Sequence, residues 1–155
     1  MKTTENRERR ALIVWIVFSA AVAAVIFSFS AQPAGQSDAV SKGLVAWILK
    51  TFFSESSLEL IQRWDTPIRK AAHFTLYFLL GFCLTGAFGH QKRLPKVPAA
   101  IGTAGIYAAL DELHQHFVEG RGPQMRDVLL DVCGAAAGAM CLALILYLVS
   151  KRKKT

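Results

Sequence analysis

A chain of 155 residues, 53% hydrophobic and 19% charged, would fold as a soluble domain only if its apolar residues were spread along amphipathic elements. Here the apolar residues are pooled into long runs with the charges between them, which excludes an ordinary soluble domain and is typical of a multi-pass membrane protein. The net charge of +7 then indicates anchoring charges beside the spans, and no nucleic-acid partner is expected.

Four apolar runs are expected to cross the membrane, at about residues 11–29, 68–89, 97–117 and 127–149. The first run could instead belong to a cleaved signal peptide, because a basic start, an apolar stretch and SFSAQPA resemble one. The length of this first run favours a retained helix, and cleavage of the run would leave an odd number of spans. The sequence thus predicts an all-α membrane protein, a four-transmembrane-helix bundle that forms a single domain over residues 1–155.

Basic side chains indicate the orientation of these spans. They gather in residues 2–10, 92–96 and 151–154. With four spans, all three segments fall on the same side, and positive charge marks that side as cytoplasmic. Both termini are therefore expected in the cytoplasm, while residues 30–70 and 111–127 face outward.

A short interfacial helix is expected in the first outer loop. Residues 43–53 place apolar side chains at near-helical spacing, which suits a segment lying in the membrane interface with Trp47 in lipid. A lid packed on the bundle is the alternative. The segment could start near Ser37, and Ser56 followed by Glu59 predicts a capping box for a second short helix.

The second span is expected to begin with Thr66 as its N-cap and Pro67 as its first helical residue. Arg69 and Lys70 would then lie in the first turn, where the helix dipole repels cations. Snorkelling to the interface would explain this placement. An anion site formed by the two cations and the helix N-terminus would explain it equally well.

His73 and Tyr77 follow Arg69 at intervals of four residues, so the three side chains share a helix face. A histidine one turn inside a membrane helix turns away from lipid. It either staples two helices by a hydrogen bond or serves a site.

The third span has only 14 uncharged residues, 97–110, which rise about 21 Å as a helix and fall short of the hydrocarbon core. The helix is therefore expected to continue through DELHQHF. Asp111, His114 and Gln115 then lie near one face, and Glu112 lies on a neighbouring one. So many polar groups are expected to point into the bundle or a wet cavity.

In the fourth span, Asp127, Asp131, Gly134 and Gly138 fall on one continuous stripe. The two glycines form a small-xxx-small face for close helix contact, which brings Asp131 against another helix. A buried carboxylate there requires a basic partner, for which His73 and three nearby arginines are candidates. The three cysteines all lie inside spans, at spacings that predict no disulfide and no metal site.

Several ordered pieces of this chain resemble the VanZ-like family of small bacterial integral membrane proteins. They are FSAQ at 29–32 with Ser37, RKAAHFTLYFLLG at 69–81, YAALDELHQHFVEGR at 107–121 and DVLLDVCGAAAG at 127–138. The resemblance implies a four-helix domain in the bacterial plasma membrane. The naming member of the family is linked to resistance to teicoplanin, a lipid-tailed glycopeptide antibiotic, so the resemblance implies a role at the cell envelope without implying a known reaction.

The outer ends of the helices are expected to form a polar site, in which Arg69, His73, Asp111, Arg121 and Asp131 converge. The candidate acid–base residues are His73, Asp111, Glu112 and His114. The candidate substrate-binding residues are Arg69, Lys70, Tyr77, Gln115, Arg121 and Arg126. Asp127 and Asp131 are interpreted as structural residues or as ligands of a divalent cation, and no other cofactor is expected.

Three classes of function fit these residues. An enzyme would hold the phosphate of a lipid-linked substrate with its cations and use a histidine for proton transfer. A non-catalytic protein would bind an anionic or polyprenyl-linked lipid headgroup, or a lipoglycopeptide, and alter its access to the wall precursor. Transport or proton relay ranks third, because the cytoplasmic halves of the spans lack ionisable groups.

Overall fold

The computed structural model describes residues 2–54, 57–89, 96–122 and 124–152, and this part of the chain contains helices and no strand. The helices are α1 (Lys2–Ser30), α2 (Ala34–Phe53), α3 (Leu58–Phe88), α4 (Lys96–Gln115) and α5 (Met125–Arg152). The predicted all-α fold is confirmed. Each of the four expected spans corresponds to one helix, while α2 lies between the first two of these helices, in the segment expected to form the first outer loop.

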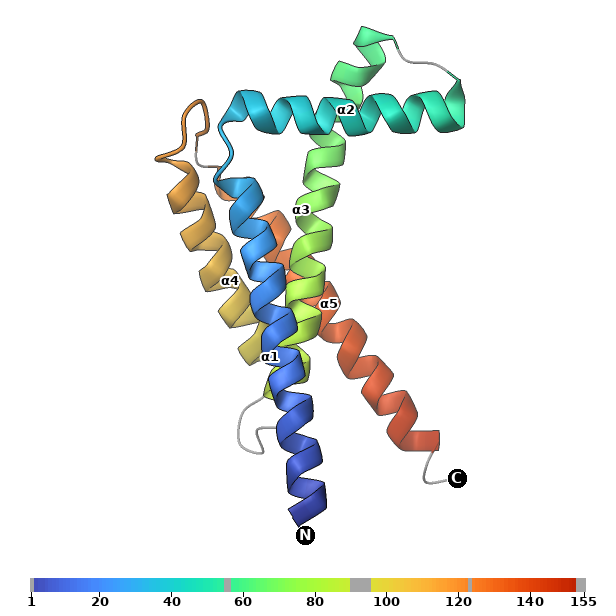
Figure 1. Cartoon of the computed structure of the whole chain (residues 1–155), viewed down its shortest axis with the longest axis vertical. Coiled ribbons are helices and arrows are strands. Elements are labelled where there is room, and N and C mark those ends of the chain that lie inside the picture. Colours follow the sequence, from blue (N-terminus) through green and yellow to red (C-terminus); the bar gives the residue numbers. More distant parts are fainter. Residues whose placement is uncertain (1, 55–56, 90–95, 123, 153–155) are drawn as a thin grey trace.

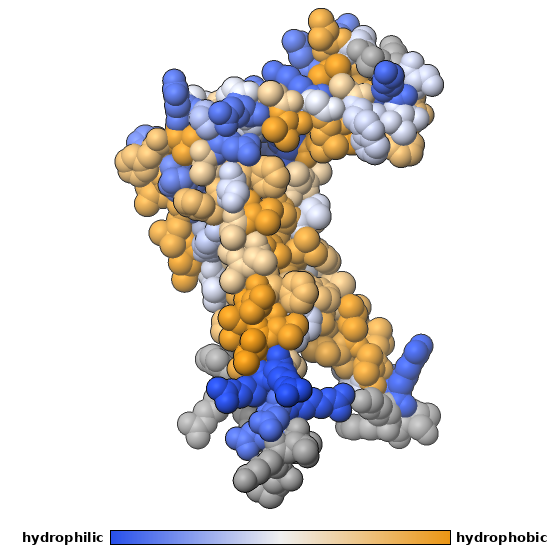
Figure 2. Space-filling view, in the orientation of Figure 1, coloured by the Kyte–Doolittle hydropathy of each residue, from blue (hydrophilic) through white to orange (hydrophobic). Residues whose placement is uncertain are grey.

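Three of these helices, α1, α3 and α5, are long and apolar enough to cross a membrane. α4 has 20 residues, which rise about 30 Å, but its last turns carry acidic and amide side chains that lower its hydropathy. In Figure 1 the helices α1, α3, α4 and α5 run roughly along the long axis, and α2 lies across one end. Both chain termini lie at the other end, where Figure 2 shows a band of hydrophilic side chains below an apolar belt.

Glycines allow α3 and α5 to pack backbone against backbone. A Cβ atom on Gly134 would lie 2.5 Å from the carbonyl oxygen of Phe74, and one on Gly138 would collide with that of Phe78. Gly81 of α3 faces Ala135 of α5 in the same way. The predicted small-xxx-small face is therefore confirmed, with α3 as its partner.

The predicted start of the second span at Thr66 is wrong. α3 begins at Leu58, nine residues before the expected first helical residue Pro67, with Ser57 as its N-cap, and it continues through Pro67. The side chain of Ser57 accepts a hydrogen bond from the Leu60 amide at 3.4 Å. Consequently the N-terminus of α3 does not lie beside Arg69, and that part of the anion-site hypothesis is wrong.

α2 is also longer than the segment expected from residues 43–53, because it begins at Ala34 rather than near Ser37. Trp47 is 61% exposed and Phe53 is 69% exposed, while Val45 is fully buried against the bundle. The second short helix of the sequence analysis belongs to α3. Ser56, on which its capping box was based, lies outside the described residues, as do Lys92, Arg93 and residues 153–154 of the basic segments.

We expect Gly138→Ala to lower the free energy of unfolding by about 1–3 kcal/mol, because the new methyl group forces α5 away from the backbone of Phe78. Gly102→Ala on α4 is the matched control. Its Cβ would meet no atom within 4 Å, so the change is expected to be neutral or to stabilise the helix by up to about 1 kcal/mol. Thermal unfolding in detergent, followed by circular dichroism, measures both; equal effects would contradict the close packing.

Candidate functional site

Polar side chains gather at the end of the bundle that α2 covers, opposite to the termini (Figure 1). Ser30, the last residue of α1, donates a hydrogen bond of 2.7 Å from Oγ to Oδ2 of Asp111 on α4. Gln115, one turn further along α4, donates from Nε2 to both of these oxygens at 3.3 Å. All three side chains are buried, so this cluster fastens the end of α1 to the end of α4.

Two contacts between a basic and an acidic side chain connect α3 with α5. Nδ1 of His73 lies 3.6 Å from Oδ1 of Asp131, whose side chain is only 4% exposed. Closer to the helix end, Nζ of Lys70 lies 3.1 Å from Oδ1 of Asp127. A carboxylate as buried as Asp131 requires a partner of this kind. Of the basic residues expected as candidates to pair with Asp131, His73 is the one that contacts it.

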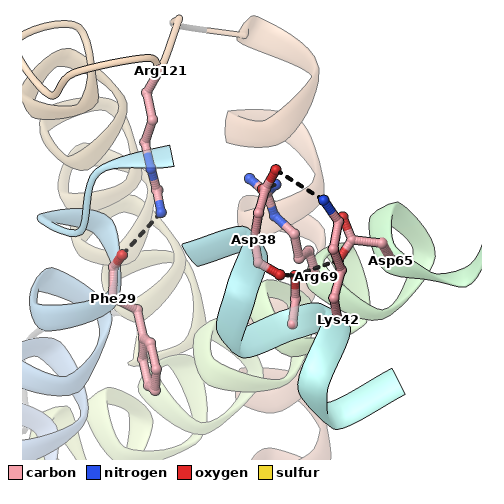
Figure 3. Close-up of polar contacts among 7 residues, drawn as sticks. Phe29, Asp38, Lys42, Asp65, Arg69 and Arg121 are labelled. Carbon is pink, nitrogen blue, oxygen red and sulfur yellow. Dashed lines mark hydrogen bonds and ion pairs between the residues drawn. The ribbon is translucent and has the colours of Figure 1, made fainter. Parts of the chain in front are cut away.

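A second set of contacts holds α2 against α3. Nη1 of Arg69 donates to Oδ1 of Asp38 at 2.7 Å, and Nζ of Lys42 lies 3.6 Å from the other carboxylate oxygen. The Ser41 hydroxyl donates to the buried carboxylate of Asp65. Figure 3 shows these side chains together where α2 crosses α3.

Arg121, in the turn between α4 and α5, reaches back over the bundle. Its Nη2 donates to the carbonyl oxygen of Phe29 at 3.1 Å, as Figure 3 shows. Its Nε is buried and has no hydrogen-bond partner among the described residues. Burial lowers the pKa of the Arg121 guanidinium, and the positive charge of Arg69 lowers that pKa further, while Asp111 and Glu112 act in the opposite direction. Arg121 is thus a cation close to a second cation and pairs directly with no carboxylate of the described residues.

A cavity of about 220 Å³ lies among these groups. It is lined by Thr66, Arg69, Lys70, His73, Glu112, Gln115, Arg121, Gln124, Asp127 and Leu130. The carboxylate of Glu112 accepts a hydrogen bond from the backbone amide of Gln124, just before α5. We call this space the polar cavity. Its walls come from α3, α4, the α4–α5 turn and α5.

A family model described as VanZ/LLP1 matches residues 15–147, which covers most of the chain. The chain belongs to this family. The resemblance in the sequence analysis is thereby confirmed. No curated protein and no solved structure matches the chain. Fold and family therefore agree on a membrane protein, while the role of the polar cavity has to be argued from its own residues.

The VanZ/LLP1 match covers all residues proposed for the site, and the structure brings most of them together. Arg69, Lys70, His73, Glu112, Gln115, Arg121 and Asp127 line the polar cavity. Asp111 and Asp131 lie behind the wall, each bound to a residue that lines it. The structure therefore brings Arg69, His73 and Arg121 to one cavity, with Asp111 and Asp131 directly behind its wall.

Three of the proposed residues lie elsewhere. Tyr77 is fully buried in the apolar core, with its ring centroid 6.4 Å from that of Tyr107. His114 packs on Phe27, with ring centroids 4.8 Å apart, on the α1 side of α4. Arg126 is exposed on α5 and does not line the polar cavity. These positions do not support roles for them in contact with a ligand.

Three further residues at this end of the bundle were not among the expected site residues. Ser30 lies in the FSAQ piece of the resemblance, but its pairing with Asp111 links residues 81 positions apart, which spacing along one helix does not reveal. Asp38 directly follows Ser37, where the first outer helix was expected to start, and Asp65 directly precedes Thr66. A buried acidic side chain beside a serine of a neighbouring helix requires the tertiary structure to be found.

A divalent cation was considered for Asp127 and Asp131, together with Asp111. Among the described residues, no group of three or more histidine, cysteine, aspartate or glutamate side chains is arranged to hold a metal ion. Each of the three carboxylates instead has its own partner, Lys70, His73 or Ser30. The cation stays an untested hypothesis.

We expect Ser30→Ala to lower the free energy of unfolding by about 1–3 kcal/mol, because it leaves the buried Asp111 carboxylate without its best donor. Ser28→Ala is the matched control on the same helix. The hydroxyl of Ser28 is exposed and bonds only to the carbonyl oxygen of Ala24, so its loss is expected to change stability by less than about 0.5 kcal/mol. Urea or thermal unfolding in detergent separates the two variants, and similar losses would contradict the buried cluster.

Proposed function

We propose that this VanZ/LLP1 protein crosses the bacterial plasma membrane four times, through α1, α3, α4 and α5, with both termini in the cytoplasm. α2 then lies along the outer membrane–water interface, with Trp47 and Phe53 toward lipid. The proposal is supported by the three long apolar helices, by the hydrophilic band at the terminal end and by the position of α2 across the other end. A polar cavity at the α2 end would open to the outer leaflet.

Cysteine labelling tests this topology. In a background with Cys83, Cys133 and Cys141 replaced, we expect a cysteine at Gly35 to react with a membrane-impermeant maleimide in whole cells. A cysteine at Ser150 is expected to react only after the cells are lysed. A side chain at Gly35, near the start of α2, would meet no atom within 4 Å, and Ser150 is exposed near the opposite end of the bundle. A cysteine thiol at either position is therefore accessible to the reagent. The reverse pattern would invert the proposed orientation.

For the site, we infer binding of the phosphate headgroup of a lipid-linked cell-envelope component. The observation that carries this inference is Arg121, a cation with a buried and unpartnered Nε beside a second cation, Arg69, at a cavity that both line. The charge of Arg69 lowers the pKa of Arg121, so the two guanidinium groups repel each other, and an anion in the cavity would offset that repulsion. Guanidinium groups present paired N–H donors that match a phosphate.

The acidic groups of the cavity do not oppose this inference. Asp127 is paired with Lys70, and Glu112 accepts from the backbone amide of Gln124. Both carboxylates are thus engaged within the protein, although Oδ1 of Asp127 is buried without a hydrogen-bond partner among the described residues. Arg121, in contrast, is a cation that pairs with no carboxylate of the described residues, which favours an anion as the ligand of the cavity.

We expect Arg121→Gln to weaken binding of dodecyl phosphate by about 10- to 100-fold, because a charge-assisted, bidentate contact is lost. Arg126→Gln is the matched control, since Arg126 is exposed and does not line the cavity. The measurement is native mass spectrometry of the protein in detergent with titrated dodecyl phosphate. If both variants bound dodecyl phosphate equally weakly, the loss would reflect the lower surface charge of the protein, and this would contradict a specific site at Arg121.

Catalysis is the second candidate, favoured by one observation. His73 lines the polar cavity while its Nδ1 faces the Asp131 carboxylate, so Nε2 is the ring nitrogen left for proton transfer. The Asp131 carboxylate would orient the ring and stabilise its protonated form. Such a pair could take a proton from water as the water attacks the terminal phosphorus of a lipid diphosphate held by Arg69 and Arg121, which breaks the P–O–P bond and releases inorganic phosphate from the lipid monophosphate.

We expect His73→Gln to retain dodecyl phosphate within about threefold of the unchanged protein, because glutamine keeps a hydrogen-bonding group of similar size. If the protein is an enzyme, the same variant loses by about 100-fold or more the release of phosphate from a polyprenyl diphosphate. Phosphate release that is absent from the unchanged protein, or unaffected by the substitution, leaves binding as the function.

A role in resistance to teicoplanin-type antibiotics would follow from binding alone. A protein that holds a lipid-linked precursor at the outer leaflet changes how much of it a lipid-tailed glycopeptide can reach. This part of the proposal rests on the family and on the position of the cavity rather than on any reaction.

A further inference from the structure

A second cavity of about 170 Å³ lies beneath α2, bounded by α1 on one side and by α3 on the other. Its apolar wall includes Ile26, Val40, Leu44, Ile68, Ala72 and Leu76. We call it the apolar cavity. We propose that it holds the hydrocarbon chain of the ligand, next to the phosphate that Arg69 and Arg121 bind, so that the site takes a phosphate-bearing lipid by both its head and the start of its chain. This inference rests on the proposed function of the polar cavity.

The two cavities share residues. Arg69, His73 and Arg121 line both of them, so these three side chains form the partition between a polar and an apolar space. A free phosphate ion would use only the polar side of that partition. An amphiphile would place its phosphate in the polar cavity and its hydrocarbon chain in the apolar cavity. The bond between the two parts would then lie at the guanidinium groups of Arg69 and Arg121. This juxtaposition is the observation that carries the inference.

The apolar cavity also suits a hydrocarbon chain in size and surroundings. A dry, apolar protein cavity of about 150 Å³ holds a benzene molecule, so a cavity of about 170 Å³ has room for roughly six methylene groups. Val40 and Leu44 of α2 are about half exposed beside it, as is Phe29 at the end of α1. The remainder of a longer chain could therefore leave between α1 and α2 into the surrounding lipid.

The apolar wall is explained better by a ligand than by packing alone. Ala72 lies on α3 between Ile68 and Leu76, where a larger side chain would fill part of the space. α2 is held beside this space by the polar contacts of Asp38 with Arg69 and of Ser41 with Asp65, and further along by its buried Val45 and Leu49. The contacts fix the helix at a distance that leaves the cavity open.

Photo-crosslinking tests the proposal. The protein is reconstituted in phosphatidylcholine nanodiscs with a 12-carbon alkyl phosphate that carries a diazirine on its fifth carbon. Crosslinks are expected on Leu44, Ile68 or Leu76, located by tandem mass spectrometry. Ala72→Phe is expected to reduce this crosslinking by about tenfold, because a benzyl group displaces several methylene groups and each buried one contributes several-fold to binding.

Ala71→Phe is the matched control, because Ala71 and Ala72 are both exposed neighbours on α3, while Ala71 lines neither cavity. It is expected to leave the crosslinks unchanged. Arg121→Gln is expected to reduce them in parallel with its loss of phosphate binding. Size-exclusion chromatography and circular dichroism establish that each variant is folded before it is compared.

The outcomes separate the two proposals. Crosslinking that depends on Arg121 but not on Ala72, or that maps outside the apolar cavity, overturns the chain site and leaves the phosphate site standing. Crosslinking that is indifferent to Arg121 overturns the phosphate site itself. Crosslinks at the apolar cavity that are lost in Ala72→Phe and Arg121→Gln, and kept in Ala71→Phe, support both.

Discussion

The close contact between α3 and α5 is the constraint on which the rest of the structure depends. Gly134 and Gly138 let the two backbones meet with no side chain between them, and Gly81 does the same from α3. In such a contact, side chains beside the glycines also come within reach of the facing helix. Asp131 lies three residues before Gly134 on α5, and His73 directly precedes Phe74, whose carbonyl oxygen Gly134 faces, so the contact between His73 and Asp131 depends on this glycine packing.

Charges at this end of the bundle are tolerable because they are distributed over short, separate pairings. Asp131 faces His73, Asp127 faces Lys70 and Asp38 faces Arg69, while the buried Asp111 and Asp65 accept from serine hydroxyls. Removing the partner of a buried carboxylate such as Asp131 costs far more than the pair contributes, while the partly exposed pairs of Asp127 and Asp38 contribute less. These pairings leave Oδ1 of Asp111, Asp127 and Asp131 buried without a hydrogen-bond partner among the described residues, and they leave most of the arginine donors unused.

Periodicity and charge were sufficient to predict the four long helices, the glycine face and the gathering of polar groups at one end, because these features depend on residues within one helix. They failed where tertiary contacts decide. Thr66 and Pro67 have the local preferences of a helix start, yet α3 passes through them, because Ser57 caps the helix earlier and Ser41 of α2 binds Asp65 within it. Tyr77 shares a face with Arg69 and His73, but the helix carries it two turns deeper, into the core.

The number of N–H donors on Arg69 and Arg121 explains how the site could bind an anion without losing the contacts that hold it together. A guanidinium group has five N–H donors. Within the described residues, Arg69 donates one hydrogen bond, to Asp38, and Arg121 donates one, to the Phe29 carbonyl. These bonds fix where each guanidinium group lies, while the remaining donors stay available to a ligand. Arg69 holds α2, and Arg121 holds the end of α1, so the two residues that would bind the phosphate also hold in place the two helices that border the apolar cavity.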